Sequence, residues 1–589
     1  MQYMYLTYRF LVCLILSEKK LFSDRINYSI GFFLNVNTIK YIFYLFNKDI
    51  NPIKSKEFRK FITLNKKKWK KLKKKIIISN SKEAILIESF IGHPGYSFRN
   101  VLFAKYLQLF DGSQCIGLLR KGDIRAEILW RSFGVDKFYY YKPWSFLKRC
   151  KYIYKSILIL KNIKNINTFC KIRIKKIDIG LLSYDSFMRY TRNPTAKEVN
   201  FKLILFFAEA LFACDFFEKI FHNQNITKLV QAETQFVPLN ILFQNALLKK
   251  NKVYIRSASH LSNIRIYTKF DQRFKAQGEN FSKKLFNEIF KNYKTKGIKL
   301  INKYYQKRIK ENFYGADRAD TSVVIKNSDK NFISISKSSL CKMFNWDKKK
   351  KIATIFLHIQ TDGNYKHGRR RMFLDNHTWA YYTLETIKKL KNVNWIVKEH
   401  PHEFYYNTKF DFSSLVKDLE KKYDHIRWYP ENFNPSSLIK FTDLAITSHG
   451  TAGAEYPSFG IPSINAEKSG YRGLGFTLEP KNRIEYKNLL KRAHQINKLN
   501  KQKIEKAKIY LFIRNILVRN KISMIPPYHP GRKNFDANYF WYQSIQNLKK
   551  FSINNDKFIR VFKNQLQLKY RDTVNFDLCS IKNKILNDY

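Results

Sequence analysis

Apolar runs of strand length alternate with amphipathic stretches of helical length in two separate parts of the chain. In the first part, short apolar runs predict strands at Ala84–Glu88, Gln114–Leu119, Lys137–Tyr141, Ile226–Val230 and Lys252–Ile255. The stretches between them predict helices at Phe98–Phe110, Ala126–Phe133 and Pro238–Leu248. Short strands that alternate with helices are typical of βαβ units with a parallel sheet.

The second part repeats this alternation more regularly. Its predicted strands are Ile352–His358, Asn394–Lys398, His425–Tyr429, Leu444–Thr447 and Pro462–Asn465. Its predicted helices are Asn376–Leu390, Ser413–Lys422, Ser436–Phe441 and Thr451–Phe459. The sequence therefore predicts an α/β protein with two Rossmann-like domains that face each other across a cleft. In such sheets, ligands bind beyond the carboxyl ends of the strands.

The remaining segments lack this alternation. Residues 260–350 are rich in lysine and predict a helical insertion without strands, with a loop over 317–337. Helices are predicted again over 484–519. The expected organisation is a basic N-terminal segment (1–75), an N-terminal Rossmann-like domain (76–259), the helical insertion or linker (260–350), a C-terminal Rossmann-like domain with its helices (351–519) and a tail (520–589).

The strongest polar motif follows the predicted strand Leu444–Thr447 and reads Ser-His-Gly-Thr-Ala-Gly-Ala-Glu. Its small residues would let a ligand approach the backbone, and the start of the next helix offers N–H groups to a phosphate. Ser448 or Thr451 could cap the helix or donate to the phosphate. Glu455 could accept hydrogen bonds from ribose or sugar hydroxyls. The alternative interpretation is an ordinary tight turn between a strand and a helix.

A second motif ends the strand Asn394–Lys398 and reads Lys-Glu-His-Pro-His. Pro401 fixes the backbone after His400 and so orients its imidazole. Either Lys398 or His400 could bind a phosphate or a nucleotide base. A purely structural role for a lone histidine beside a proline is the competing interpretation.

A third motif follows the strand Ile352–His358 and places His358 and Asp362 at the same predicted edge. The basic run Lys366–Arg371 could face a diphosphate or an acidic sugar, although a solvated loop is an equal alternative. Together, the three motifs predict a nucleotide-sugar pocket in this half. The glycine-rich loop Gly470–Phe476, which carries Arg472, could close over the donor.

These motifs also carry a resemblance. Lys398–Pro401, Thr447–Pro462 and Tyr471–Thr477 resemble segments of bacterial capsule and surface-carbohydrate biosynthesis proteins. They are similar to capsular Kdo transferases and bacterial sialyltransferases, which share a His-Pro motif in the nucleotide-binding domain of a GT-B fold. The resemblance covers mainly residues 350–490, with weaker similarity at 85–136 and 184–189. It implies a GT-B-like glycosyltransferase that moves a sugar from a nucleotide-activated donor, such as a CMP-linked acidic sugar.

The resemblance also implies roles for individual residues. His400 and Pro401 would contact the nucleotide, and Glu455 would orient hydroxyl groups of the donor. The phosphate would be held by the turn after the strand Leu444–Thr447. The motifs and the resemblance together give the candidate donor-binding residues His358, Lys398, His400, Pro401, Ser448, His449, Gly450, Thr451, Gly453, Glu455 and Arg472. The acceptor would be a growing surface polysaccharide or its lipid-linked precursor, bound by residues 76–259.

The catalytic base is less well defined by the sequence. Sialyltransferase-like proteins carry two acidic residues before a glycine, whereas this chain has Thr361-Asp362-Gly363, which retains only Asp362. In the N-terminal half, His93 in the turn Gly92–Gly95 and Asp185 are further candidates. No convincing Asp-x-Asp loop is present, so the sequence predicts transfer without a metal ion or any cofactor besides the donor substrate.

Charge leaves other functions open. The formal net charge is +64, from 110 Lys and Arg against 46 Asp and Glu. Such a surface attracts polyanions, but the lysines are spread along the whole chain and no nucleic-acid-binding motif accompanies them. The charge fits AT-rich codon usage equally well, so we expect no nucleic-acid partner. A glycerophosphotransferase or a nucleotide-sugar epimerase on the same scaffold is the nearer alternative.

One basic run suggests a membrane surface. Lys66–Lys75 contains eight lysines and Trp69, a composition that can bind anionic lipid head groups. A solvated helix face is an equal alternative. The apolar run Phe10–Leu16 is far shorter than the roughly 20 residues of a membrane-spanning helix. The seven cysteines form no CxxC pair. We therefore expect a cytoplasmic protein that is peripheral on the inner membrane.

Overall fold

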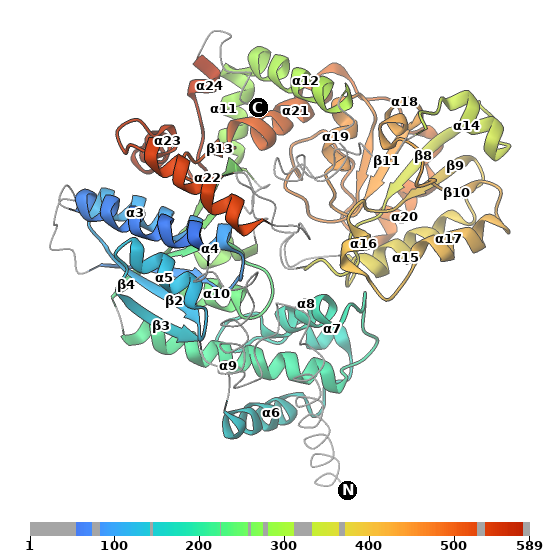
Figure 1. Ribbon diagram of the computed structural model, residues 1–589. Helices are drawn as coiled ribbons and strands as arrows, with labels where there is room; N and C mark the ends of the chain where they lie inside the picture. Colours follow the sequence, from blue (N-terminus) through green and yellow to red (C-terminus); the bar gives the residue numbers. More distant parts are fainter. Residues whose placement is uncertain are drawn as a thin grey trace, which may run out of the picture. The chain divides into compact units, whose positions relative to one another are not determined.

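The computed structural model describes most of the chain (Figure 1). The described residues are 55–73, 83–141, 145–223, 225–256, 261–274, 281–310, 333–364, 372–526 and 536–580. The apolar run Phe10–Leu16, residues 317–332 of the loop predicted over 317–337, and the basic run Lys366–Arg371 lie outside these ranges.

The chain forms two compact units. The first contains Met1–Phe187, Lys197–Arg273 and Asn520–Thr573. The second contains Met188–Ala196, Phe274–Arg519 and Val574–Tyr589.

A six-stranded sheet organises the first unit. Its order is β3 (Lys137–Tyr141), β2 (Gln114–Arg120), β1 (Ala84–Ser89), β4 (Ile226–Gln231), β5 (Lys252–Arg256) and β7 (Ile264–Tyr267). The first five strands are parallel, and β7 pairs antiparallel with β5. Every residue of β1 is buried, as expected of a central parallel strand covered on both faces.

The helix after β1 shows why the local sequence folds as it does. Helix α4 (Pro94–Asp111) begins at Pro94, because the His93 ring caps its first turn and proline suits the first helical position. It ends at Gly112, which adopts the left-handed conformation that glycine tolerates. This cap starts the helix four residues before the predicted Phe98.

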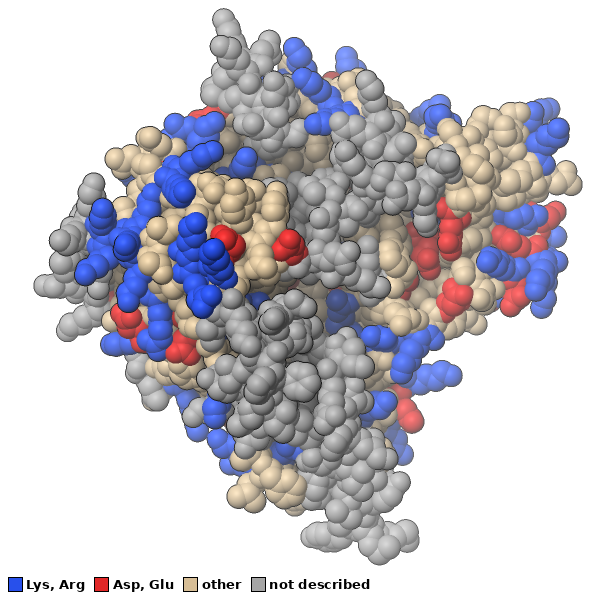
Figure 2. Space-filling model, in the orientation of Figure 1, with Lys and Arg blue, Asp and Glu red and all other residues tan. Residues whose placement is uncertain are grey.

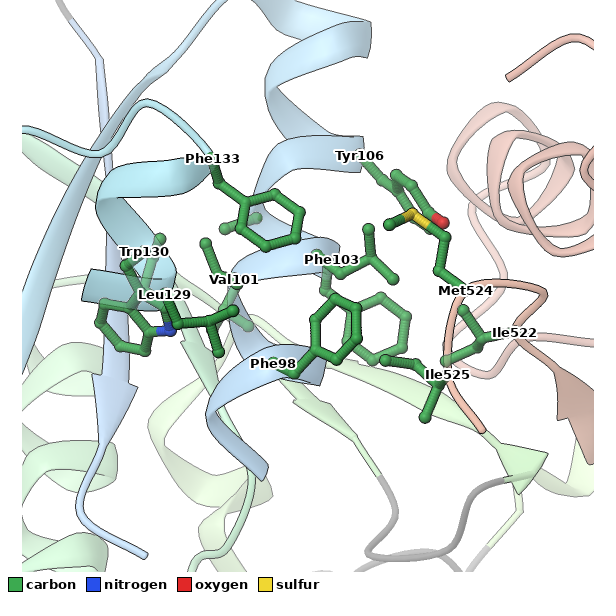
Figure 3. Packing of buried hydrophobic residues seen from close by; sticks show 14 of the residues in the cluster. Phe98, Val101, Phe103, Tyr106, Leu129, Trp130, Phe133, Ile522, Met524 and Ile525 are labelled. Atoms are coloured by element: carbon green, nitrogen blue, oxygen red, sulfur yellow. The ribbon is translucent and has the colours of Figure 1, made fainter. Parts of the chain in front are cut away.

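Helix α4 lies at the centre of the first hydrophobic core. Phe98, Val101 and Phe103 project from it toward α5 (Ile124–Ser132) on one side and toward the segment Ile522–Ile525 on the other (Figure 3). The C-terminal part of the chain therefore completes this core, which also receives Trp541 from α22 (Ala537–Lys550). The remaining helices of this unit are α6 (Phe146–Leu160), α7 (Ile166–Phe169), α9 (Phe201–Asn223), α10 (Leu239–Leu248) and α23 (Lys557–Gln567).

The predicted membrane-binding run proves to be part of a packed helix. Helix α3 (Lys56–Lys73) packs against α22 and α5, and its Trp69 is only 3% exposed. The Trp69 ring lies 5.3 Å from the Phe133 ring centroid and 6.4 Å from that of Phe551. The expectation that Trp69 sits on lipid is therefore wrong, because the indole fills the core and Lys68 donates to the Leu548 and Phe551 carbonyls. Lys66, Lys67, Lys70 and Lys71 remain exposed.

Residues 260–350 also differ from the expectation of helices alone. They include two strands, β6 (Leu261–Ser262), which pairs with β13 (Asn520–Lys521), and β7. The strand β7 is held by the later chain, since Ile266 N–H donates to the Arg571 carbonyl at 2.8 Å. Strand β6 pairs with β13 about 260 residues later, and β7 adds a bridge to Asp572, about 300 residues later, to its pairing with the nearby β5. A sequence window does not contain these distant partners.

A five-stranded parallel sheet organises the second unit. Its order is β10 (Ile426–Trp428), β9 (Val393–Lys398), β8 (Lys351–Phe356), β11 (Leu444–Thr447) and β12 (Ser463–Asn465). The predicted strands of this half are confirmed within a few residues at each end. The order matters for function, because it places the ends of β9, β8 and β11 side by side.

Helices cover the second sheet and extend beyond it. Those that connect the strands are α15 (Asn376–Ile387), α16 (Glu403–Tyr406), α17 (Phe412–Glu420), α18 (Leu438–Phe441) and α19 (Ala452–Ser458), and α20 (Arg483–Lys491) follows the last strand, β12. A separate helical layer contains α11 (Lys283–Asn292), α12 (Lys294–Lys310) and α21 (Lys501–Phe512), which pack on one another. Three further helices are α14 (Lys337–Phe344), α24 (Asp577–Ser580) and α8 (Ile179–Thr191), whose last residues belong to this unit. The predicted α/β class with two parallel sheets is confirmed.

Candidate functional site

Three histidines meet at the carboxyl edge of the second sheet. His358 follows β8, His400 follows β9 and His449 follows β11, and these strands are neighbours. The His358 ring centroid lies 3.9 Å from that of His449 and 5.8 Å from that of His400. Three strands that are far apart in the sequence therefore bring the three predicted motifs together. We call His358, His400 and His449 the histidine cluster.

The His-Pro turn fixes the orientation of His400. Its Nδ1 accepts the backbone N–H of His402 at 3.2 Å, across the intervening Pro401. Burial lowers the pKa of His400 well below its usual range, and the neighbouring His358 and His402 rings lower it further. The ring is therefore neutral at pH 7, with its proton on Nε2, because Nδ1 acts as an acceptor. Nε2–H can then donate to a bound oxygen.

The first unit contains the same local turn. The Nδ1 of His93 accepts the backbone N–H of Gly95 at 3.1 Å, across Pro94, at the carboxyl end of β1. Its ring lies edge-on to Tyr96, and Arg125 donates to the carbonyl of Gly92 in the same turn. His93 is thus a helix cap whose Nε2 edge faces away from the capped backbone. Asp185, the other candidate of this unit, is only 1% exposed within α8.

Asn376 is a member of the site that sequence reasoning missed. It is 2% exposed at the start of α15, and its amide donates to Nδ1 of His358 at 3.2 Å and to the Ile359 carbonyl at 2.8 Å. Its oxygen accepts from Ser448 Oγ at 3.5 Å, and Ser448 Oγ lies 2.9 Å from Nδ1 of His449. Asn376 therefore links two of the three histidines. A single asparagine at a helix start carries no signal of this role in the sequence.

The turn after β11 is packed more tightly than its small residues suggested. A Cβ added at Gly453 would lie 2.0 Å from the hydroxyl of Tyr471, and one added at Gly450 would lie 2.8 Å from Oγ1 of Thr447. The Tyr471 hydroxyl also donates to the Gly450 carbonyl at 2.7 Å. The glycines thus make room for Tyr471 and for the turn itself.

The start of α19 differs from the prediction in its capping. Gly453 N–H donates to the Gly450 carbonyl, and the next two N–H groups donate to the Thr451 carbonyl. Thr451 stands at the cap position, but among the described residues its side chain makes no capping hydrogen bond, and Ser448 bonds to Asn376 and His449 instead. With only seven residues, α19 offers a short dipole, so the histidine side chains become the main polar groups of this edge.

Acidic residues surround the His-Pro turn. Glu403 is 7% exposed and accepts from Gln360 N–H at 3.1 Å and from the Thr408 hydroxyl. Burial raises its pKa, with a further contribution from the charge of Asp362. Asp362 accepts from Gly363 N–H at 3.1 Å, and its charge also acts on His400. The structure therefore places Asp362 close to the histidine cluster, as its motif predicted.

Three other predicted donor-binding side chains, those of Lys398, Arg472 and Glu455, contact groups of the protein itself. Lys398 lies over the Tyr429 ring, 5.6 Å from its centroid, and burial lowers its pKa to about 8. Arg472 donates to the Pro480 carbonyl at 3.0 Å and lies 3.7 Å from a Glu479 oxygen. Glu455 accepts from the Tyr305 hydroxyl at 3.5 Å. The Arg472 loop is thus anchored by Glu479, where a freely closing loop was expected.

The raised pKa of Glu399, which lies next to His400, can be tested by its effect on stability. Burial raises its pKa to about 7, and the carboxylates of Glu403, Asp411 and Glu431 add to the effect. A carboxyl group whose folded pKa exceeds its unfolded value of about 4.3 destabilises the fold increasingly as the pH rises between these values. We expect Glu399→Gln to raise the free energy of unfolding by roughly 1–2 kcal/mol at pH 8, after allowance for solvent screening.

Urea denaturation of both proteins at pH 8 and pH 5 measures this difference. The gain should shrink at pH 5, where the folded carboxyl group is already protonated. A gain of equal size at both pH values would contradict the assigned pKa and indicate a packing effect.

Comparisons with known proteins give little at the level of sequence. No protein-family model matches the chain. A search of curated proteins also finds no match.

Solved structures give weak overall likenesses. The chain is similar to KpsC, a β-Kdo 2,4-transferase of Thermosulfurimonas dismutans, with 10% identity, a TM-score of 0.28 and coverage of 49% of this chain and 79% of that one. It is similar to a UDP-GlcNAc 2-epimerase of Neisseria meningitidis bound to UDP-GlcNAc, with 10% identity, a TM-score of 0.20 and coverage of 80% and 99%. A glycosyltransferase of Rickettsia africae gives 11% identity, a TM-score of 0.22 and coverage of 80% and 99%. TM-scores this low carry no argument about activity.

The described residues were also compared with the side-chain groupings that hold metal ions. Within the described ranges, no three His, Cys, Asp or Glu side chains are placed to share one metal ion. The histidine cluster places the ring nitrogens of three histidines at the end of a parallel sheet. Such groups suit an anionic ligand that accepts several hydrogen bonds.

Proposed function

We propose that this protein is a glycosyltransferase that transfers a sugar from a nucleotide-activated donor. The observation that carries the proposal is the meeting of His358, His400 and His449 at the ends of three adjacent strands. Ligands of parallel α/β sheets bind at this edge. The acceptor is a surface or capsular polysaccharide or its lipid-linked precursor, and the two α/β units work in the GT-B manner in the cytoplasm.

The histidine cluster binds the phosphate of the donor and stabilises it as the leaving group. A neutral His400 donates Nε2–H to a phosphate oxygen, and the negative charge of the phosphate favours protonation of the neighbouring rings. Lys398 adds positive charge from the same strand end. Donors that are already oriented by the fold stabilise the charge that develops on the departing nucleotide. The transfer proceeds without a metal ion.

The acceptor hydroxyl needs a base within about 3 Å. Asp362 is the candidate from the donor-binding unit, because its carboxylate lies at the edge of the histidine cluster. His93 is the candidate from the first unit. Its Nδ1 accepts the Gly95 N–H and its proton therefore lies on Nε2, so it can take a proton from the acceptor only after it releases this helix cap. Asp185 is the weakest of the three, because its burial keeps it from an acceptor unless α8 moves.

The nature of the donor decides between the proposed activity and its alternatives. The resemblance of the His-Pro segment favours a CMP-linked acidic sugar. Purified protein should be incubated with CMP-, CDP-, UDP- and GDP-linked donors and a glycan acceptor, and the products identified by mass spectrometry. An extended glycan with release of nucleotide supports the proposal. Transfer of glycerol phosphate, or epimerisation of the donor without transfer, would overturn it in favour of the related enzymes.

Nucleotide binding should take up protons. The apo His400 ring is neutral at pH 7, and a bound phosphate raises the pKa of rings that contact it. Affinity should therefore rise as the pH falls from 8 to 6, by roughly tenfold. Protonation of Glu399 over the same range removes a nearby negative charge and acts in the same direction.

Calorimetric titration with CMP, CDP and UDP in buffers of different ionisation enthalpy measures the proton uptake directly. Glu399→Gln separates the two contributions, because it removes the carboxylate and keeps all three rings. Proton release on binding, or an affinity that does not change with pH, would contradict phosphate binding by the histidine cluster.

A further inference from the structure

Helix α6 exposes an apolar stripe that nothing in the donor site requires. Phe146, Leu147, Tyr154 and Leu158 are 56%, 78%, 54% and 39% exposed. Leu147, Tyr154 and Leu158 are spaced by seven and four residues, so they lie on one side of the helix. Elsewhere in the described part of the chain, large exposed apolar side chains occur singly or in pairs on a helix.

The opposite side of α6 is firmly packed. Ile153, Ile157 and Leu160 are fully buried, and α6 lies along α9 in the first unit (Figure 1). The Tyr152 ring packs edge-on against Phe212, and its hydroxyl donates to Asp215 at 2.9 Å. The exposed stripe is therefore the outer side of a helix that is held in place, and removing its side chains should not unfold the protein.

On α6 itself the stripe is bordered by lysines alone, while Asp215 and Glu218 of the neighbouring helix α9 are paired with Lys175. Lys148, Lys151 and Lys155 are exposed beside it, and α6 contains no Asp or Glu. Lys161 continues this border after the helix ends. Across the visible face of the protein, in contrast, Lys and Arg are scattered over many elements (Figure 2). A helix with an apolar stripe and a lysine border suits the boundary between anionic head groups and acyl chains.

We infer that α6 is the membrane-contacting element of this protein and that it binds the surface of an anionic bilayer. The apolar residues insert at the level of the head groups while the three lysines pair with lipid phosphates. Among the described residues, no helix combines the length and apolar character needed to cross a bilayer. Because the other side of α6 is packed on α9, contact through the α6 stripe is peripheral. This inference stands apart from the proposed glycosyl transfer, because the histidine cluster belongs to the other unit.

Flotation of the full-length protein with vesicles tests the inference. The protein should float with phosphatidylglycerol vesicles at low salt and much less with phosphatidylcholine vesicles. Substitution of Leu147, Tyr154 and Leu158 by Ser should lower the partition coefficient at least tenfold. Lys148→Glu, Lys151→Glu and Lys155→Glu together should lower it on the order of 100-fold.

Two matched controls sharpen the test. Ile484→Ser removes an apolar side chain that is 73% exposed on α20, and it should leave flotation unchanged. The second control replaces the exposed lysines of α3 (Lys66, Lys67, Lys70 and Lys71) by Glu. These lysines lie on a helix that packs against α22, which exposes Tyr539 and Tyr542. Loss of flotation in the α3 variant with normal flotation of the α6 variants would overturn the inference.

Other occupants of the stripe give different results. If a second copy covers it, the wild-type protein will be a dimer by light scattering and the serine variant a monomer, with no lipid binding in either. If the N-terminal segment of the chain covers it, flotation will be absent and hydrogen exchange of residues 1–54 will increase in the serine variant. Either result would overturn membrane binding by α6. Thermal shift with nucleotides should be unchanged in every α6 variant, which separates this failure from a failure of the donor site.

Discussion

Replacement of His400 by Asn is expected to lower the rate of transfer by about 100- to 1,000-fold, the usual effect of removing one oriented hydrogen-bond donor. Asn can keep the local turn, because its side-chain oxygen can accept the N–H of His402 as Nδ1 does now. It cannot replace the Nε2–H that we assign to the donor phosphate. The variant should therefore fold normally, lose nucleotide binding by calorimetry and show little turnover with the preferred donor.

His402→Asn is the matched control for this experiment. His402 lies two residues later in the same turn. His400 Nδ1 accepts the backbone N–H of His402, and the His402 ring takes no part in this hydrogen bond. We expect its transfer rate to stay within a few-fold of wild type. Equal losses in both variants would point to disruption of the turn, and full activity of His400→Asn would remove the histidine cluster from the proposed mechanism. Asn376→Asp extends the test, since it would replace the amide that donates to His358.

Replacement of Asp572 by Ala is expected to lower the stability of the first unit by about 3–5 kcal/mol. The Asp572 carboxylate lies 2.7 Å from Nε of Arg265 and accepts from Asn263 at 2.9 Å. Arg265 and Asp572 are 1% and 2% exposed, so removal of one partner leaves a guanidinium group buried without its counter-charge. The pair also joins the late segment 571–573 to β7, where Ile266 N–H donates to Arg571.

Hydrogen exchange measured by mass spectrometry suits this test, because the two units need not unfold together. Exchange should accelerate in peptides that contain 264–267 and 571–573 and remain slow across β8 and β9. Asp418→Ala removes a surface carboxylate paired with Lys421 and serves as the control, with no change expected. Unaltered exchange in Asp572→Ala would mean that the late segment does not hold β7 in place.

The sequence predicted the regular parts of the fold because their signals are local. In the second unit, buried strands such as Leu444–Thr447 are flanked by turn residues and amphipathic helices, and the predicted and observed bounds agree there. The strands β6 and β7 were missed, because their stability comes from pairing with β5, with β13 and with residues 571–573. Trp69 was misassigned for a related reason, since a lysine run hides the spacing of Phe58, Phe61 and Trp69 on the buried side of α3.

Some residues of the candidate site could be predicted from the sequence, and others could be found only in the structure. His358, His400 and His449 could be nominated from sequence, because each follows an apolar run that ends in polar residues. Asn376 could not, because its contacts with His358 and Ser448 depend on how α15 packs beside β8 and β11. Gly453 was assigned to ligand approach, whereas Tyr471 occupies the space beside it. Local spacing does not reveal which side chain a distant loop will place against a glycine.

By itself, the sequence determined two α/β halves and the strand ends that carry polar chemistry, because strand and helix periodicity and the residues that end each element are properties of neighbouring positions. Only the tertiary structure decided that three strand ends are adjacent, that Trp69 is core while the α6 stripe is surface, and that the late segment completes the first unit. Adjacency and burial depend on which distant residues pack together, and each of these outcomes was fixed by such long-range contacts.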